Sequence, residues 1–255
     1  AIIDRSSWTN TLPVLAWLLV VEMMYLAALP MTMLVFRLLP DRGIILARVL
    51  GLLLVSYVSW LLVSLDWIGF SRASIYLGFV AVGALSSLAL ATHWREIKGF
   101  WGQHWRLLVM GEVLFLAAFL GFVALRAANP DLWHPWRGGE KPMELAYFNA
   151  VIRSTSMPPF DPWFAGGYLN YYYWGYFPLA ALVRITGIVP TTAFNLAVPL
   201  FFALTVTSAY SLVYNLAEGV RRSQDVPTSE PGPLMEPEVK ERRWQRRLWG
   251  PVTGG

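Results

Sequence analysis

A chain of 255 residues that is 56% hydrophobic and only 14% charged has the composition of a membrane protein, because soluble domains carry about 25% charged residues. It contains no cysteine, which excludes disulfides, zinc–thiolate sites and cysteine nucleophiles. Its 3 histidines lie far apart, so a metal site could rest only on carboxylates, and none is predicted. The sequence also lacks the glycine loops that bind nucleotides and the serine-hydrolase motif.

Five apolar runs follow one another and predict an all-α, polytopic transmembrane helix bundle. Each is close to or above the roughly 20 residues that a helix needs to cross hydrocarbon. Pro30 and Pro199 lie inside the first and last runs and should kink them. Between the third and fourth runs lies a basic, tryptophan-rich connector, residues 92–106, suited to the lipid headgroup layer. The runs cover residues 12–39, 44–65, 73–91, 107–125 and 191–217.

Residues 171–188 are apolar enough to be a sixth span. They are short, however, they contain Arg184, and they begin with a cluster of Tyr and Trp. With five spans, the connectors and tail on one side carry 3, 3 and 7 Lys or Arg, and the segments on the other side carry 1, 1 and 4. The positive-inside rule then places the N-terminus outside and the C-terminus inside. The expected location of this multi-pass protein is the plasma membrane. Five spans are favoured, with six as the alternative.

The five-span topology divides the chain into four parts. The N-terminus and the loop of residues 127–190 are predicted outside the cell, and the C-terminal tail is predicted in the cytoplasm. The closing residues WGPVTGG are typical of the approach to another helix, so we expect a piece of a larger protein. The predicted parts are a four-helix transmembrane region (1–126), an extracytoplasmic loop with short juxtamembrane helices (127–190), a transmembrane helix (191–217) and a basic tail or connector (218–255).

Two acids, Glu22 and Glu112, lie within apolar runs, where ionisable groups are costly and often functional. Glu112 is close enough to the basic inner end of its run to pair or to snorkel there, which favours a structural role. Glu22 is deeper, and the sequence offers no explanation for it.

The outer loop begins with a helix signal. The glycines of GGEKP (residues 138–142) permit a turn, and proline suits the first helical position. The helix should run to about Arg153, with acids near the positive end of its dipole. Helical spacing places four residues on one face, namely Glu144, Tyr147, Phe148 and Val151.

A stiff turn should follow this helix at residues 157–162 (MPPFDP). Asp161 can lend its carboxylate to nearby N–H groups there. Gly166 and Gly167 then permit close backbone approach, ahead of the aromatic run of residues 171–174 (YYYW).

The segments GGEKPME, PPFDPWFAGGYLNYYYWGYF and AFNLAVPLFFAL resemble the hydrophobic YYY-domain membrane proteins (DUF2298). The resemblance covers nearly the whole chain. More weakly, the order of span, acid-bearing outer loop, aromatic juxtamembrane helix and span is similar to membrane glycosyltransferases of the GT-C class. That resemblance implies a polyprenyl-phosphate sugar donor and a catalytic acid ahead of an aromatic pair. Glu144 holds that position, and Glu140 is the other candidate because no Asp-Glu pair stands together.

The predicted function is therefore GT-C-like transfer of a sugar from a polyprenyl-phosphate donor at the outer membrane face, by this chain or by the larger protein of which it is the N-terminal part. A carboxylate would take the acceptor proton, with Glu144 as base and Glu140 and Asp161 assisting. Cations, or a divalent ion such as Mg²⁺ or Mn²⁺, would hold the departing phosphate; the cofactor itself is unknown. The predicted substrate-binding residues are Lys141, Arg153, Trp163, Asn170, Tyr171, Tyr172, Tyr173, Trp174 and Arg184.

Each of these residues also has a structural interpretation. The glutamates can cap a helix, Asp161 can make a turn, the aromatic cluster can be an interfacial belt, and the cations can touch headgroups. The alternative function is accordingly a non-enzymatic membrane protein, either a subunit of a membrane protein complex or a lipid or polysaccharide transporter. The expected partners are membrane lipid and a polyprenyl-phosphate sugar, not nucleic acid, because the tail arginines suit the anionic inner leaflet.

Overall fold

The computed structural model describes residues 3–131 and 141–224. Predictions for Glu140 and for the tail beyond residue 224 lie outside the described residues. The chain divides into two compact units, Ala1–Ala217 and Glu218–Gly255. Of the second unit only the last turns of a helix are described, and there Glu218 pairs with Arg221 and Arg222.

The described residues are helical, as the sequence predicts, and contain no strand beyond a single antiparallel bridge between Phe160 and Tyr168. The helices are α1 (Trp8–Thr11), α2 (Pro13–Val35), α3 (Ala47–Ser64), α4 (Arg72–Ala128), α5 (Lys141–Arg153), α6 (Tyr173–Thr186) and α7 (Pro190–Gln224).

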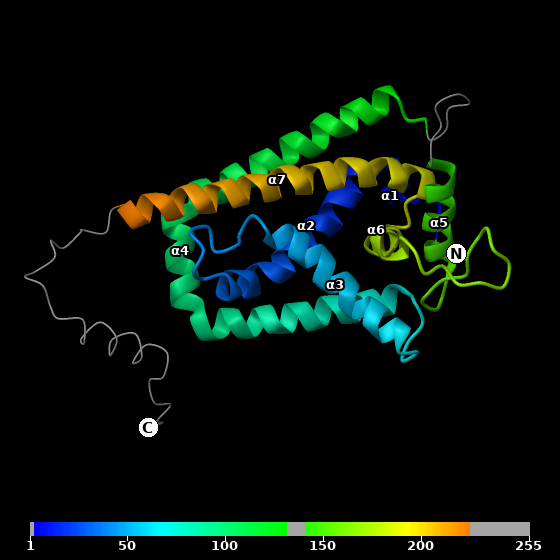
Figure 1. Cartoon of the computed structure of the whole chain (residues 1–255), viewed down its shortest axis with the longest axis horizontal. Coiled ribbons are helices and arrows are strands. Elements are labelled where there is room, and N and C mark those ends of the chain that lie inside the picture. Colours follow the sequence, from blue (N-terminus) through cyan, green and yellow to red (C-terminus); the bar gives the residue numbers. More distant parts are fainter. Residues whose placement is uncertain (1–2, 132–140, 225–255) are drawn as a thin grey trace, which may run out of the picture. The chain divides into compact units, whose positions relative to one another are not determined.

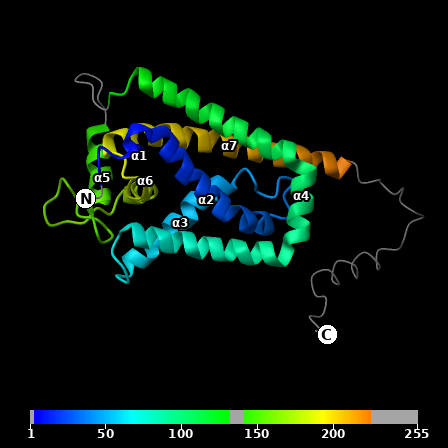
Figure 2. The same ribbon diagram turned by 180° about the vertical axis from the view of Figure 1, so that it is seen from behind.

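Four helices, α2, α3, α4 and α7, are long and apolar enough to cross a membrane. The third and fourth predicted runs are both part of α4, whose backbone leaves helical geometry at His93 and His104. Figures 1 and 2 show α4 as a first arm, a crosswise middle piece and a second arm. The five predicted apolar runs are therefore present in four helices, because the basic connector (residues 92–106) is helical too.

Helices α5 and α6 lie at the end of the bundle away from the connector and run across the direction of the long helices (Figure 1). Helix α6 has 14 residues, a rise of about 21 Å at 1.5 Å per residue, which is short of a hydrocarbon core of roughly 30 Å. It is not among the helices long enough to span. The sequence suggested a helix lying on the interface, but residues 177–184 of α6 are buried without a break.

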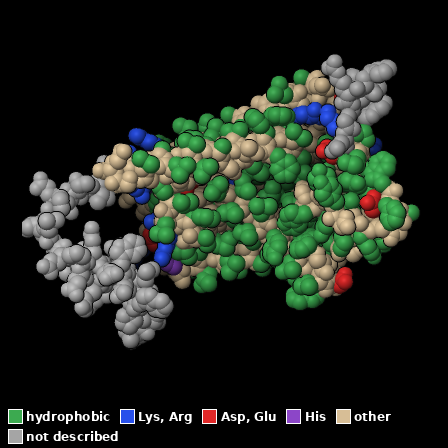
Figure 3. Space-filling view, viewed as in Figure 1, with side chains coloured by type: hydrophobic (Ala, Val, Ile, Leu, Met, Phe, Trp, Pro, Cys, Tyr) green, Lys and Arg blue, Asp and Glu red, His purple; other side chains and the backbone are tan. Residues whose placement is uncertain are grey.

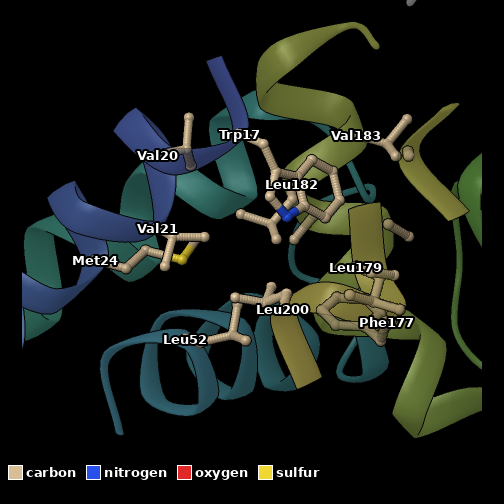
Figure 4. Close-up of a cluster of buried hydrophobic side chains, with 14 of the residues drawn as sticks. Trp17, Val20, Val21, Met24, Leu52, Phe177, Leu179, Leu182, Val183 and Leu200 are labelled. Atoms are coloured by element: carbon tan, nitrogen blue, oxygen red, sulfur yellow. The ribbon is translucent and has the colours of Figure 1, made fainter. Parts of the chain in front are cut away.

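One apolar core explains this burial. Side chains from α2, α3, α6 and α7 meet around α6 (Figure 4). They include Trp17, Met24, Leu52, Phe177, Leu182 and Leu200. Outside this core, hydrophobic side chains also cover the visible sides of the long helices in Figure 3, as expected for surfaces that face lipid.

Two glycines bring neighbouring helices into backbone contact. A Cβ atom at Gly51 of α3 would lie 2.2 Å from the carbonyl oxygen of Met24 in α2, and one at Gly78 of α4 would lie 2.4 Å from that of Val55 in α3. Small residues at such crossings let membrane helices pack closely. The close packing of α2 on α3 and of α3 on α4 therefore depends on two positions where no side chain fits.

Polar side chains attach α7 and its connection to the rest of the unit. Asn10 Nδ2 donates to the carbonyl of Gly187 at 2.9 Å, and its Oδ1 accepts from Val189 N–H at 2.9 Å. Farther along α7, Ser211 donates to the buried carboxylate of Asp41 at 2.6 Å. These bonds hold the α6–α7 connection and attach α7 at a second point along its length.

An ion cluster around the buried Arg48 joins α2, α3 and α4. Arg48 donates to both carboxylate oxygens of Glu22, at 3.0 and 2.9 Å, and to Glu112 at 2.5 Å. Its guanidinium also lies over the rings of Tyr25 and Phe115, at 4.5 and 3.9 Å. The cluster accounts for Glu22, which had no explanation in the sequence, and it gives Glu112 the structural pairing that was favoured for it.

Candidate functional site

A pocket of about 590 Å³ opens where α5 meets the link to α6. One wall is a face of α5 and the other is the turn that follows it. The pocket carries both charges and hydrogen-bonding groups beside apolar surface, as ligand sites do. Its lining residues are Ala146, Asn149, Ala150, Arg153, Ser154, Phe160, Asp161 and Pro162.

Asp161 shapes the loop on the far side of the pocket. Its Oδ1 accepts hydrogen bonds from the N–H groups of Trp163 and Phe164, at 2.8 and 3.2 Å, so the predicted use of its carboxylate is confirmed. Main-chain bonds from Asp161 N–H to Gly167 (2.9 Å) and from Leu169 N–H to Pro159 (2.8 Å) close the loop. Asp161 therefore has a fixed position at the pocket.

The residues between Pro159 and Tyr172 form an aromatic loop whose rings face outward. Trp163 and Tyr171 keep 65% and 64% of their surface exposed. Phe160 and Tyr168 stack on each other with ring centroids 4.9 Å apart. Asn170, another predicted contact residue, is exposed as well.

The tyrosine run itself divides into two halves. Tyr171 and Tyr172 are exposed, whereas the Tyr173 hydroxyl accepts from Trp60 Nε1 at 3.1 Å and the Trp174 ring lies 5.3 Å from that of Trp60. The division falls at Tyr172, which has a left-handed backbone with φ of 65°. Only the first half is therefore exposed, and the second half attaches α6 to α3.

Glu144 lies in the first turn of α5, on the side away from the pocket. It shares its face with Phe148 and Val151, as predicted, and both of these are fully buried. The Glu144 side chain is half-buried, and within residues 3–131 and 141–224 no hydrogen bond or ion pair reaches it.

Arg184 is buried, with only 5% of its surface exposed. Its Nη2 donates to the carbonyls of Ile152 and Ser154, at 2.7 and 2.6 Å, and its guanidinium lies 4.3 Å from the centre of the Phe70 ring. Burial lowers the pKa of the Arg184 guanidinium to about 10, so it keeps its charge at neutral pH. A cation that caps carbonyls at a helix C-terminus stabilises that helix, and Ser154 lines the pocket.

The segments that build this site lie within the part of the chain that a family model matches. The family model for an uncharacterized membrane protein (DUF2298) matches residues 54–253, more than half of the chain. The chain belongs to the DUF2298 family. The match confirms the family that the YYY motif indicated, and it contains α5, the aromatic loop and α6. No curated protein and no solved structure matches the chain.

In this DUF2298 protein the predicted site residues fall into separate groups. Arg153 and Asp161 meet in the pocket, and Lys141 lies exposed one turn before Glu144 on α5. Among the described residues no group of three or more His, Asp or Glu could hold a metal ion. The roles predicted for these residues stay predictions, and the structure supplies their positions.

Sequence reasoning missed Asn149 and Ser154 as pocket residues. The helical spacing of Ala146, Asn149, Ala150 and Arg153 could have predicted a second, more polar face of α5. Ser154 could not have been found in this way, because its place depends on the turn after the helix and on Arg184.

Proposed function

We propose that this DUF2298 protein transfers a sugar from a polyprenyl-phosphate donor at the membrane face where α5 and the aromatic loop lie. The observation that carries the proposal is the pocket that Arg153 and Asp161 share at the end of the apolar bundle. It lies beside exposed aromatic rings. A lipid-linked sugar needs this combination, because its chain stays in hydrocarbon while its phosphate and sugar meet charged groups.

The reaction would proceed by attack of an acceptor hydroxyl on the anomeric carbon of the sugar. The bond from that carbon to the phosphate oxygen breaks, and the polyprenyl phosphate departs with the electron pair. Arg153 would hold the departing phosphate, since charge develops there in the transition state. A carboxylate would take the proton of the acceptor hydroxyl, and the faces of Trp163 and Tyr171 would stack on sugar rings.

Two described acids are candidates for the base, and they lie on different sides of α5. Asp161 lines the pocket with Arg153, which favours it on geometry. Glu144 holds the position of the catalytic acid in the GT-C resemblance and has no partner among the described side chains. One of them takes the proton of the acceptor hydroxyl, and substitution shows which one.

The test measures transfer from a radiolabelled polyprenyl-phosphate sugar in membranes that contain the protein. Asp161→Asn keeps an oxygen that can accept the Trp163 and Phe164 N–H bonds but removes the base. Glu144→Gln is the matched variant on the other side of α5. We expect one of the two to lose transfer by at least 100-fold and the other to retain it. Full activity in both variants would refute an acid at either position.

The ion cluster of Arg48, Glu22 and Glu112 favours a second candidate function, that of a transporter or a subunit of a membrane assembly. Ionisable groups within spans often mark pathways for ions or substrates. Under this alternative, Glu22→Gln would abolish function in a transport assay while Asp161→Asn and Glu144→Gln would not. The opposite pattern is expected for the sugar transferase.

A further inference from the structure

We propose that the α4 connector, residues 92–106, is a binding site for anionic lipid headgroups of the phosphatidylglycerol type. The inference is independent of the proposed transferase. Figure 1 shows the connector at the end of the bundle away from α5 and α6 and crosswise to both arms of α4. Near its two ends lie the non-helical positions His93 and His104, which turn the helix out of the direction of the spans and lay it along one end of them.

The inner face of the connector is anchored to the bundle. Ile97 and Phe100 are buried against Tyr25, Leu29 and Met33 of α2. Trp101 Nε1 donates to the sulfur of Met33 at 3.1 Å. The connector is therefore a fixed part of the fold, and its opposite face has a defined direction.

The outer face of the connector combines exposed tryptophans with cations. Trp94 and Trp105 expose 47% and 55% of their surface. Lys98 Nζ lies 5.9 Å from the Trp94 ring, and the Arg106 guanidinium lies 5.6 Å from the Trp105 ring. Amphipathic rings and cations in this arrangement are typical of helices that lie in the headgroup layer.

The charge on this face is not neutralised by the protein. Glu96 is the one acid among residues 92–106, and it pairs with Arg42 at 2.7 Å. Within the described part of the chain, no carboxylate forms an ion pair with Arg95, Lys98 or Arg106. Three exposed cations without an acidic partner are complementary to lipid phosphates.

Two glycines leave part of the helix surface between these cations without side chains. Gly99 and Gly102 are exposed, and a Cβ atom at either would meet nothing within 4 Å. Glycine is unfavourable inside a helix, and no close packing requires it here. Without side chains at these positions, a headgroup can approach the helix between Lys98 and Arg106.

The test compares two pairs of substitutions that remove the same charge. Lys98→Gln/Arg106→Gln changes the connector, and Arg5→Gln/Arg72→Gln removes two exposed cations elsewhere. Binding of phosphatidylglycerol and of phosphatidylcholine is measured by native mass spectrometry of the purified full chain in mixed micelles. Near a membrane each basic residue contributes enough that we expect the connector pair to weaken phosphatidylglycerol binding by roughly 10- to 30-fold, and the control pair by less than about threefold. Phosphatidylcholine binding should not change.

Equal losses in the two pairs, or no loss in the connector pair, would overturn the proposal. A second variant, Gly99→Leu/Gly102→Leu, keeps every charge and fills open space, so the fold should tolerate it. We expect it to weaken phosphatidylglycerol binding several-fold. Unchanged binding would overturn the placement of the headgroup over the glycines.

Discussion

Arg48 is the residue on which the charge balance of three helices depends. Its side chain is only 3% exposed and it serves both Glu22 and Glu112. Removing one partner of a buried ion pair costs about 3–5 kcal/mol, because the remaining charge is left buried without compensation. Arg48→Met leaves the Glu22 and Glu112 carboxylates without their cation, but these side chains are 27% and 37% exposed. We therefore expect a free energy of unfolding lower by no more than about this amount, measured by thermal or SDS-induced unfolding in micelles.

Neutralising the carboxylates provides the control. In Arg48→Met/Glu22→Gln/Glu112→Gln no charge remains in the cluster. A neutral amide that is left without the arginine costs less desolvation free energy than a carboxylate does. The triple variant should therefore recover a large part of the lost stability. If it is no more stable than Arg48→Met alone, the cluster is not held together by charge.

Arg184 provides a second prediction at this scale. Arg184→Leu leaves the carbonyls of Ile152 and Ser154 without their donor, at a cost of about 1–3 kcal/mol for each buried group. We expect a melting temperature clearly below that of the wild type, together with disorder at the end of α5. Arg153→Gln, which changes an exposed arginine on the same helix, should melt like the wild type. A normal melting curve for Arg184→Leu would contradict the capping role.

Single residues were the hardest part to predict from the sequence. Asp161 could be assigned to its turn because the bonds it makes are local. Arg48 could not be matched with Glu22, because the pair is 26 positions apart and depends on how α2 and α3 pack. The division of the YYY run could not be foreseen either, since it rests on the left-handed backbone of Tyr172.

At the scale of the elements, the glycine crossings make a prediction with a control in the same arm of α4. Gly78→Ala would place a methyl group 2.4 Å from the Val55 carbonyl oxygen, so α3 and α4 must separate. We expect a loss of about 1–3 kcal/mol, as for other overpacked sites. Gly83→Ala meets nothing within 4 Å and should stabilise the helix by about 0.5–1 kcal/mol. Equal melting temperatures for the two variants would refute the close crossing.

The elements themselves were largely predictable, for a physical reason. An apolar run of hydrocarbon length has few alternatives to a helix, and the GGEKP signal predicted α5 to within one residue of its observed start at Lys141. The sequence did not predict that two runs join in α4, because the composition of the basic connector is compatible with a loop as well as with a helix. The burial of α6 was missed because it depends on the tertiary core around Phe177 and Leu182.

At the scale of the whole molecule, the five-span topology predicts which side of the membrane each end of the bundle faces. The chain has no cysteine, so single cysteines can report their side by labelling with a membrane-impermeant maleimide in intact cells. Thr155 lies exposed beside α5, and Gln103 lies exposed on the connector. Positive-inside charge placement predicts labelling of Thr155→Cys in intact cells, and of Gln103→Cys only after the membrane is permeabilised.

Labelling at a third position, in the tail, distinguishes five membrane crossings from six. With five crossings, the tail lies on the same side as the connector, and Glu241→Cys should behave like Gln103→Cys. With six, residues 171–188 would cross as well and Glu241→Cys would label in intact cells. The 14 residues of α6, at about 21 Å, are too short for that crossing, so we expect Glu241→Cys to remain protected. Labelling of Thr155→Cys and Gln103→Cys from the same side would refute either topology, because the second arm of α4 lies between these two positions.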